Sequence, residues 1–345
     1  MVDITVKGAG IFGLSVAYAC AFRGARVRVI DNKGVAAGAS GGLVGALAPH
    51  TPENWNAKKA FQFDSLMMAE DLWARVAQLS GQSPGYLRSG RLQPIHDARA
   101  LELAHARAET AKSLWQGKAE WHVIPAADHA EWAPQSPTGY LIHDTLTARI
   151  HPQRATRALA DAVIALGGEI VIGTSDIEGH LVEATGYQGL IDLSKKVAKS
   201  AGNGVKGQAV LLQFDARTAP QLFADALHIV PHEDGTVAIG STSEREFDAP
   251  DTTDAQLDQV LTRAIAAFPI LREAVVLKRW AGVRPRAKSR APMLGHHPVL
   301  ANAYIANGGF KIGFGMAPKV GEVMADLILE NRDTIPDEFK PEASL

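Results

Sequence analysis

The stretch that most constrains this chain is its first 32 residues, in which short apolar runs alternate with a glycine-rich turn and an alanine-rich segment. Residues 4–6 are an Ile-Thr-Val run, and the turn after it reads Gly-Ala-Gly-Ile-Phe-Gly at residues 8–13. Residues 14–23 predict a helix, and residues 26–30 predict a second strand that Asp31 closes. Strand, G-x-G-x-x-G turn, helix and second strand in this order are typical of a β-α-β unit.

Each part of this unit suits the binding of a dinucleotide. Gly8 permits a tight turn, Gly10 lets the backbone approach a pyrophosphate, and Gly13 lets the helix lie close to the strand. The free N–H groups and the partial positive charge at the start of the helix favour phosphate there. Asp31 stands at the end of the second strand, where a carboxylate accepts hydrogen bonds from ribose hydroxyls. The unit therefore predicts a dinucleotide cofactor.

Composition limits the other classes of function. A length of 345 residues suits two interleaved domains, and a net charge of −2 gives no general attraction to nucleic acid or membranes. No apolar run approaches the ~18 residues of a membrane span, and no basic segment precedes the first apolar stretch as in a signal peptide. Cys20 is the only cysteine, which fits a reducing compartment, and it reads as a core residue. We therefore expect a cytoplasmic protein.

A second glycine-rich string follows the β-α-β unit. Residues 38–49 contain four glycines and four larger apolar side chains, with little polar bulk. A flexible linker is one interpretation. We favour backbone that passes close to a flat ligand, because the apolar residues argue against a solvated linker.

The rest of the chain leaves the first domain and returns to it. After a helix at 58–79, a strand at 86–95 and a helix at 98–116, a helix at 153–166 and a strand at 169–173 return to the first sheet. A further strand follows at 181–186, and the chain then leaves again through predicted strands at 207–214, 226–231 and 236–240, a helix at 252–268 and an extended piece at 279–285. A strand at 303–306 and a helix at 318–329 close the chain. The second domain is therefore an insertion. The predicted domains are residues 1–80, 140–200 and 295–340 for the first, and residues 81–139 and 201–294 for the second.

His143-Asp144 and His151 flank a short extended segment and raise the question of a metal site or a catalytic triad. No third ligand stands at a recognisable spacing, and no nucleophile motif is present. We therefore predict no metal.

Taken together, the motifs resemble the D-amino acid oxidase and glycine oxidase (DadA-type) family of FAD enzymes. The resemblance runs along nearly the whole chain, through residues 8–13, Asp31, 38–40, 151–154, 184–186, 205–208, 228–231, 280–285 and 308–313. It implies an α/β, Rossmann-like FAD-binding domain of the glutathione-reductase type with an interleaved antiparallel-sheet substrate domain. It also implies a non-covalent FAD, since the only cysteine is not near the C-terminus. The implied cofactor-binding residues are Gly8, Gly10, Ile11, Phe12, Gly13, Asp31, Asn32, Ala39, Ser40, Gly42, Leu43, Gly45, Leu47, Thr185, Gly186, Gly308, Gly309, Phe310, Lys311 and Ile312.

The resemblance also implies a reaction, the oxidation of a C–N bond in an amino acid or related amine such as a D-amino acid, glycine or sarcosine. Hydride transfer to flavin N5 needs alignment above all, and the cofactor supplies the chemistry. We expect Arg284 to hold the substrate carboxylate through its planar fork. Lys311 matches a position where relatives place an arginine near substrate or flavin.

Three features depart from the family pattern. His228 stands where glycine oxidase-like enzymes have a tyrosine that binds the carboxylate, so it is a candidate donor or a buried structural histidine. Residues 286–290 carry three further cations, which belong to a solvated loop or attract a more anionic substrate. Only residues 173–180 separate two strands that usually bracket a β-meander, which predicts an open side at the adenine end.

Other functions remain open at this level. The family also includes enzymes that act on larger, anionic amines, as in tRNA modification, although the acidic net charge makes a nucleic acid partner unlikely. An NAD(P)-dependent dehydrogenase would explain residues 8–31 but leaves the glycine loop at 308–313 without a purpose. A non-catalytic flavin module would leave Arg284 without a role. The acceptor, oxygen or quinone, and the oligomeric state do not follow from the sequence.

Overall fold

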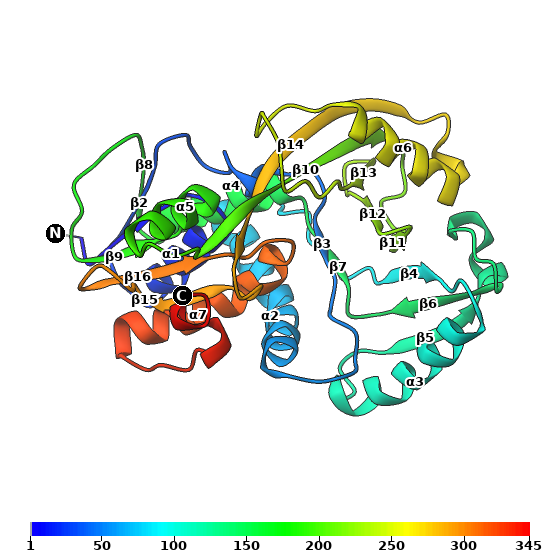
Figure 1. Cartoon of the computed structure of the whole chain (residues 1–345), viewed down its shortest axis with the longest axis horizontal. Coiled ribbons are helices and arrows are strands. Elements are labelled where there is room, and N and C mark those ends of the chain that lie inside the picture. Colours follow the sequence, from blue (N-terminus) through cyan, green and yellow to red (C-terminus); the bar gives the residue numbers. More distant parts are fainter. Residues whose placement is uncertain (1) are drawn as a thin grey trace.

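The computed structural model describes residues 2–345 and holds two large β-sheets that lie side by side, with helices packed against them (Figure 1). The first sheet has six strands in the order β15-β16-β9-β1-β2-β8, of which only β15 runs antiparallel to its neighbour. Its strands are β1 (Ile4–Lys7), β2 (Val27–Asp31), β8 (Glu169–Ile172), β9 (His180–Glu183), β15 (Met293–His296) and β16 (Ala303–Asn307). The parallel pairing of β1 with β2 and of β2 with β8 confirms the predicted α/β layer.

Helices cover both faces of this sheet. Ile305 of β16 packs with the helix of residues 186–196, whereas its neighbours Tyr304 and Ala306 belong to the large core on the opposite face. Four helices, α1, α2, α4 and α7, pack together on that opposite face, and α1 lies against α7. The helices around the sheet are α1 (Ile11–Phe22), α2 (Ala57–Ser80), α4 (Pro152–Ala165), α5 (Gly186–Lys196) and α7 (Gly313–Glu330).

The second sheet has eight strands in the order β14-β10-β13-β12-β11-β4-β6-β5, and all pairs except β11 with β4 are antiparallel. Two further helices cover it, α3 (Ala98–Leu114) beside β5 and α6 (Ala255–Ala267) beneath β10, β12 and β13. Its strands are β4 (Arg91–Pro94), β5 (Trp121–Pro125), β6 (Tyr140–Asp144), β10 (Gly202–Gln213), β11 (Gln221–Ala224), β12 (Leu227–Pro231), β13 (Thr236–Gly240) and β14 (Val275–Ala287). This is the antiparallel sheet expected of the inserted domain.

The chain crosses between the two sheets several times. A small two-stranded sheet of β3 (Ala46–Leu47) and β7 (Ala148–Arg149) lies at the crossing. Strand β6 (Tyr140–Asp144) pairs with β4 and β5 in the eight-stranded sheet, beyond the domain boundary predicted at residue 140. We therefore propose a boundary after Asp144 instead of at residue 140.

Local signals explain how several helices begin and end. Asn56 caps α2 by accepting a hydrogen bond from the Lys59 amide at 3.0 Å, and Gly81 ends it in the left-handed conformation. Asp254 caps α6 by accepting a hydrogen bond from the Gln256 amide at 2.9 Å. Within residues 2–345, no helix combines the length and the apolar character that crossing a membrane requires.

The structure differs from the sequence prediction at several elements. The sequence does not predict helix α5, because the strand expected to end in Thr185-Gly186 would lead directly out of the domain. In the structure β9 ends at Glu183, and Thr185 is the N-cap residue of α5. Leu190, Leu193 and Val197 carry the helical spacing that signals α5, and all three pack in one cluster. Helix α7 begins at Gly313 instead of Pro318, so Pro318 stands inside the helix, where it has no N–H to donate to the preceding turn.

Candidate active site

A cavity of about 900 Å³ opens at the carboxyl ends of the parallel strands. The last residues of β1, β2, β9 and β16 all line it, namely Lys7, Asp31, Glu183 and Asn307. This edge is where open α/β sheets bind ligands. From there the cavity extends to β14, where Trp280, Gly282 and Arg284 line its far end. The cavity therefore joins the predicted cofactor site to the predicted substrate site.

Most of the predicted cofactor residues line this cavity. They are Gly8, Gly10, Ile11, Phe12, Asp31, Asn32, Ala39, Ser40, Gly42, Leu43, Gly45, Thr185, Gly186, Gly308, Gly309, Phe310 and Lys311. Gly13, Leu47 and Ile312 do not line it. Gly13 has a packing role, since a Cβ atom there would come within 2.0 Å of the Gly8 carbonyl oxygen. The prediction for these three residues is thus not supported by a contact with the cavity.

The glycine turn has the geometry that its sequence predicts. Gly8 has a φ of +110°, and a Cβ atom there would lie 2.3 Å from the Ala184 carbonyl oxygen. Only glycine fits this combination of backbone conformation and close approach. The Ala184-Thr185 segment after β9 is thereby held against the turn, and both residues line the cavity.

Asp31 is held in place by backbone amides. Its Oδ2 accepts a hydrogen bond from the Ala9 amide at 2.8 Å, and its Oδ1 accepts from Lys33 at 2.8 Å and Gly34 at 3.0 Å. The carboxylate so connects β2 to the glycine turn while it lines the cavity. Since a carboxylate has about four acceptor positions, capacity remains for ribose hydroxyls.

Two helices begin at the cavity without a side-chain cap. Neither α1 nor α7 receives a capping hydrogen bond from its N-cap residue, so amides of the first turn keep their donors free for a ligand. Ser40 binds one of them, the Ile11 amide, through its Oγ at 2.9 Å. Both helix starts favour negative charge in the cavity.

Arg284 lines the part of the cavity next to β14 and has no carboxylate partner among the described residues. Its Nη2 donates to the Ser241 Oγ at 2.5 Å, and its Nη1 donates to the Thr242 carbonyl at 3.4 Å. Burial lowers the pKa of Arg284 to about 10, an effect that the nearby Glu244 opposes. Arg284 therefore carries its positive charge at neutral pH and can bind an anion in the cavity.

The glycine loop brings Lys311 to the same end of the cavity. The Phe310 amide donates to the Pro285 carbonyl at 2.9 Å, so the loop is attached to β14 next to Arg284. Burial, and then the charge of Arg284, lowers the pKa of Lys311. The Arg286 guanidinium lies 5.5 Å from the centre of the Phe310 ring. Lys288 and Arg290 are exposed, which agrees with a solvated loop.

His228 does not line the cavity. Its ring lies 4.7 Å from that of Phe223, and its buried Nδ1 has no hydrogen-bond partner among residues 2–345. Burial lowers its pKa to about 3, with the charges of Arg91 and Lys311 adding to the effect. The histidine is therefore neutral, and its predicted role in positioning substrate stays a prediction.

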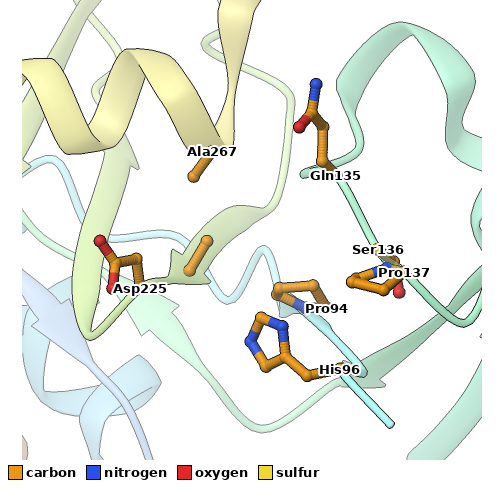
Figure 2. A pocket seen from close by; sticks show the side chains of 8 residues that line it. Pro94, His96, Gln135, Ser136, Pro137, Asp225 and Ala267 are labelled. Carbon is orange, nitrogen blue, oxygen red and sulfur yellow. The ribbon is translucent and has the colours of Figure 1, made fainter.

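A second, smaller hollow of about 400 Å³ lies at the far end of the eight-stranded sheet (Figure 2). Figure 2 shows Gln135 and Pro137 across it from Asp225. The Asp225 carboxylate is occupied by Arg263, whose Nε donates to it at 2.6 Å. The hollow shares no lining residue with the large cavity. It is therefore separate from the site of Arg284.

The residues of the large cavity fit FAD. The cavity is continuous from Asp31, the residue predicted to bind the ribose, to Arg284 and Lys311. Between them lie uncapped helix starts and a backbone that approaches closely because glycines leave no side chain in the way. Sequence reasoning missed Tyr187 and Ser241, which also line the cavity. Tyr187 belongs to α5, and the helical spacing of the apolar residues in α5 is the sequence signal that could have revealed it.

Comparisons with known proteins agree with this geometry. Residues 3–327 match the family model described as FAD dependent oxidoreductase, DAO. The chain is 26% identical over 96% of its length to the bifunctional protein ThiO/ThiG of Nostoc sp., and spans about half (53%) of that relative. It is 25% identical to a glycine oxidase of Bacillus licheniformis, covering 95% of this chain and 93% of that one.

A solved structure agrees as well. The glycine oxidase of Geobacillus kaustophilus superposes with a TM-score of 0.84 at 20% sequence identity, over 98% of this chain and 97% of that chain. This likeness shows a shared fold. The family match covers nearly the whole chain, including both sheets and the cavity between Asp31 and Arg284. The chain therefore belongs to the DAO family of FAD-dependent oxidoreductases.

Proposed function

We propose that this FAD enzyme oxidises the C–N bond of a small amino acid or related amine, of the glycine, sarcosine or D-amino acid type. The observation that carries the proposal is Arg284, a half-buried cation at the end of the cofactor cavity with no carboxylate partner among the described residues. A buried charge is costly unless it is paired. A substrate carboxylate is the partner that a planar guanidinium fork binds best.

The chain's own residues would hold the substrate for the reaction. Arg284 binds the carboxylate, and this contact places the neighbouring C–N bond in a defined orientation over the cavity. Lys311 adds a second positive charge on the loop next to β14. Trp280 packs against Gly42, whose Cβ position lies 3.3 Å from the Trp280 ring, and so forms an apolar wall. These contacts exclude water and favour an anionic amino acid.

FAD, held by the residues that line the cavity, would supply the hydride acceptor that the reaction needs. The uncapped start of α7 faces the same cavity and favours negative charge there. We propose oxygen or a quinone as the final electron acceptor. We also propose the cytoplasm as the location, where a buried lone thiol such as Cys20 stays reduced.

The test is an absorption spectrum of the purified protein, followed by anaerobic addition of glycine, sarcosine and D-alanine. We expect a flavin spectrum that at least one of these amines bleaches. The variant Arg284→Met should keep the flavin and lose kcat/KM by about 10²-fold or more, because it removes a charge-assisted bidentate contact.

A matched control is Arg279→Met on the same strand, where the arginine is exposed and pairs with Asp258. This variant should keep both flavin and turnover. A flavin that none of the amines bleaches would contradict the proposed substrate class. A protein without flavin after reconstitution with FAD would contradict the site itself.

A further inference from the structure

Ser241 occupies a position that no part of the proposed function yet uses. It follows β13 directly, and its Oγ accepts a hydrogen bond from the Arg284 Nη2 at 2.5 Å. It also lines the cavity. One hydroxyl thus touches both the group that would bind a carboxylate and the space in which that carboxylate would lie.

The hydrogen of this hydroxyl is available. A serine hydroxyl has one hydrogen to donate and two lone pairs that accept, whereas a guanidinium only donates. The contact with Arg284 therefore uses a lone pair of Oγ. Within residues 2–345, Ser241 Oγ donates to no acceptor. A hydroxyl that accepts from a cation is polarised and becomes a stronger donor.

Arg284 has other contacts that define its position. Its guanidinium lies over Gly207, where a Cβ atom would come within 1.9 Å of Nη2 and 2.2 Å of Nη1. Its Nη1 also donates to the Thr242 carbonyl at 3.4 Å. Ser241 is therefore not the only residue that positions Arg284. Its hydroxyl hydrogen can bind a group in the cavity.

We propose that Ser241 is a second substrate-binding residue, which donates its hydroxyl hydrogen to the carboxylate that Arg284 binds. This inference rests on the proposed function and deepens it. Two donors, Arg284 on β14 and Ser241 after β13, hold the carboxylate at more than one point; the two strands flank β10 in the sheet. The pair selects amines that carry a carboxylate beside the C–N bond over amines that lack one.

The test uses the holoenzyme and acetate, a carboxylate without an amine, with binding followed by the change in flavin absorption. We expect Ser241→Ala to raise the Kd for acetate about tenfold, the loss of one hydrogen bond to a charged group. Ser241→Thr keeps the hydroxyl and should restore most of the affinity. With glycine as substrate, the KM of Ser241→Ala should rise while kcat stays within about threefold. Ser243→Ala, at an exposed serine two residues away, is the matched control and should leave the Kd unchanged.

Two results overturn the inference. One is an acetate Kd that stays within about twofold of the wild type in Ser241→Ala. The other is an equal loss in Ser241→Ala and Ser241→Thr, both with full flavin content, which would show that the site requires the shape of serine and not its hydroxyl. Failure of the proposed function looks different. If acetate binding depends on Ser241 but no amino acid bleaches the flavin, the substrate reaction is wrong and the carboxylate contact stands.

Discussion

The guanidinium of Arg284 lies against the backbone of Gly207, in the space that any other residue would fill with its side chain. A Cβ atom at Gly207 would come within 1.9 Å of Nη2 and 2.2 Å of Cζ. The two residues meet because β10 and β14 are antiparallel neighbours, in which Val205 pairs with Arg284 and Gly207 with Gly282. The absence of a side chain at Gly207 on β10 thus leaves room for the side chain of Arg284 on β14.

Gly207→Ala tests this relationship. The new methyl group would displace the guanidinium, which is the far end of a flexible side chain, so the expected cost in stability is small. Misplacement of a binding group by about 1 Å can cost about 10²-fold in rate. We expect kcat/KM to fall about 100-fold with little change in flavin content or in the thermal midpoint. A loss of folding together with activity would contradict the idea that only Arg284 is displaced.

Asp31 provides a prediction for the cofactor end. Asp31→Asn places an amide where three backbone N–H groups donate to the carboxylate. Because charge-assisted hydrogen bonds are roughly twice as strong as neutral ones, the turn should loosen and the Kd for FAD should rise by about tenfold or more. FAD release, followed by flavin fluorescence, measures this. Asp176→Asn, at an exposed carboxylate beyond β8, is the control and should bind FAD like the wild type. Equal FAD affinity in both variants would argue against the role of Asp31.

His232 predicts how stability depends on pH. It is 1% exposed, its Nε2 donates to the Leu43 carbonyl at 3.0 Å, and its Nδ1 has no partner in the described structure. Burial, and then the neighbouring His151, lowers its pKa to about 4, from a usual value near 6.5. Between these two pKa values His232 is therefore protonated in the unfolded chain and neutral in the folded chain. The resulting stability is complete above pH 6.5 and is lost as the pH falls toward 4.

At pH 5 this loss should amount to about 2 kcal/mol of the free energy of unfolding, at about 1.4 kcal/mol for each pH unit. Urea unfolding at pH 7 and pH 5 measures it. His232→Gln keeps an N–H donor but cannot take the proton, so its stability should fall less between the two pH values. His105→Gln, at an exposed histidine of α3, should behave as the wild type does. The same fall in His232→Gln and the wild type would assign the acid sensitivity to other groups.

Cys20 should be chemically inert in the native protein. The side chain is completely buried in α1, and burial raises the pKa of its thiol to about 12. Since the thiolate is the reactive form, a thiol reagent at pH 8 should modify Cys20 only after denaturant unfolds the chain. Rapid labelling of the folded holoenzyme would show that α1 opens locally.

The β-α-β unit could be predicted from the sequence because its determinants are local. The glycines of residues 8–13, the apolar run of β1 and the acid at Asp31 act on neighbours in the chain, and the structure places them as expected. The insertion of the second domain also followed from the sequence, since a helix and a parallel strand returned at residues 152–172.

Longer-range elements were predicted less well. Helix α5 was missed because Gly186 and Gly189 near its start weaken the local helical signal, while packing of Leu190 and Leu193 stabilises it. The sequence does not indicate that β6 pairs with β4 and β5, because this pairing joins segments that are distant in the chain.

The sequence alone therefore determined the fold class and the cofactor, and it singled out Arg284 as a candidate site residue, because each rests on motifs that are contiguous in the chain. The tertiary structure decided what surrounds Arg284. Gly207, Ser241 and Lys311 come from three separate segments, and only the register of β10, β13 and β14 and the attachment of the glycine loop bring them together. Strand register and loop docking depend on contacts between residues far apart in sequence, which no local pattern specifies.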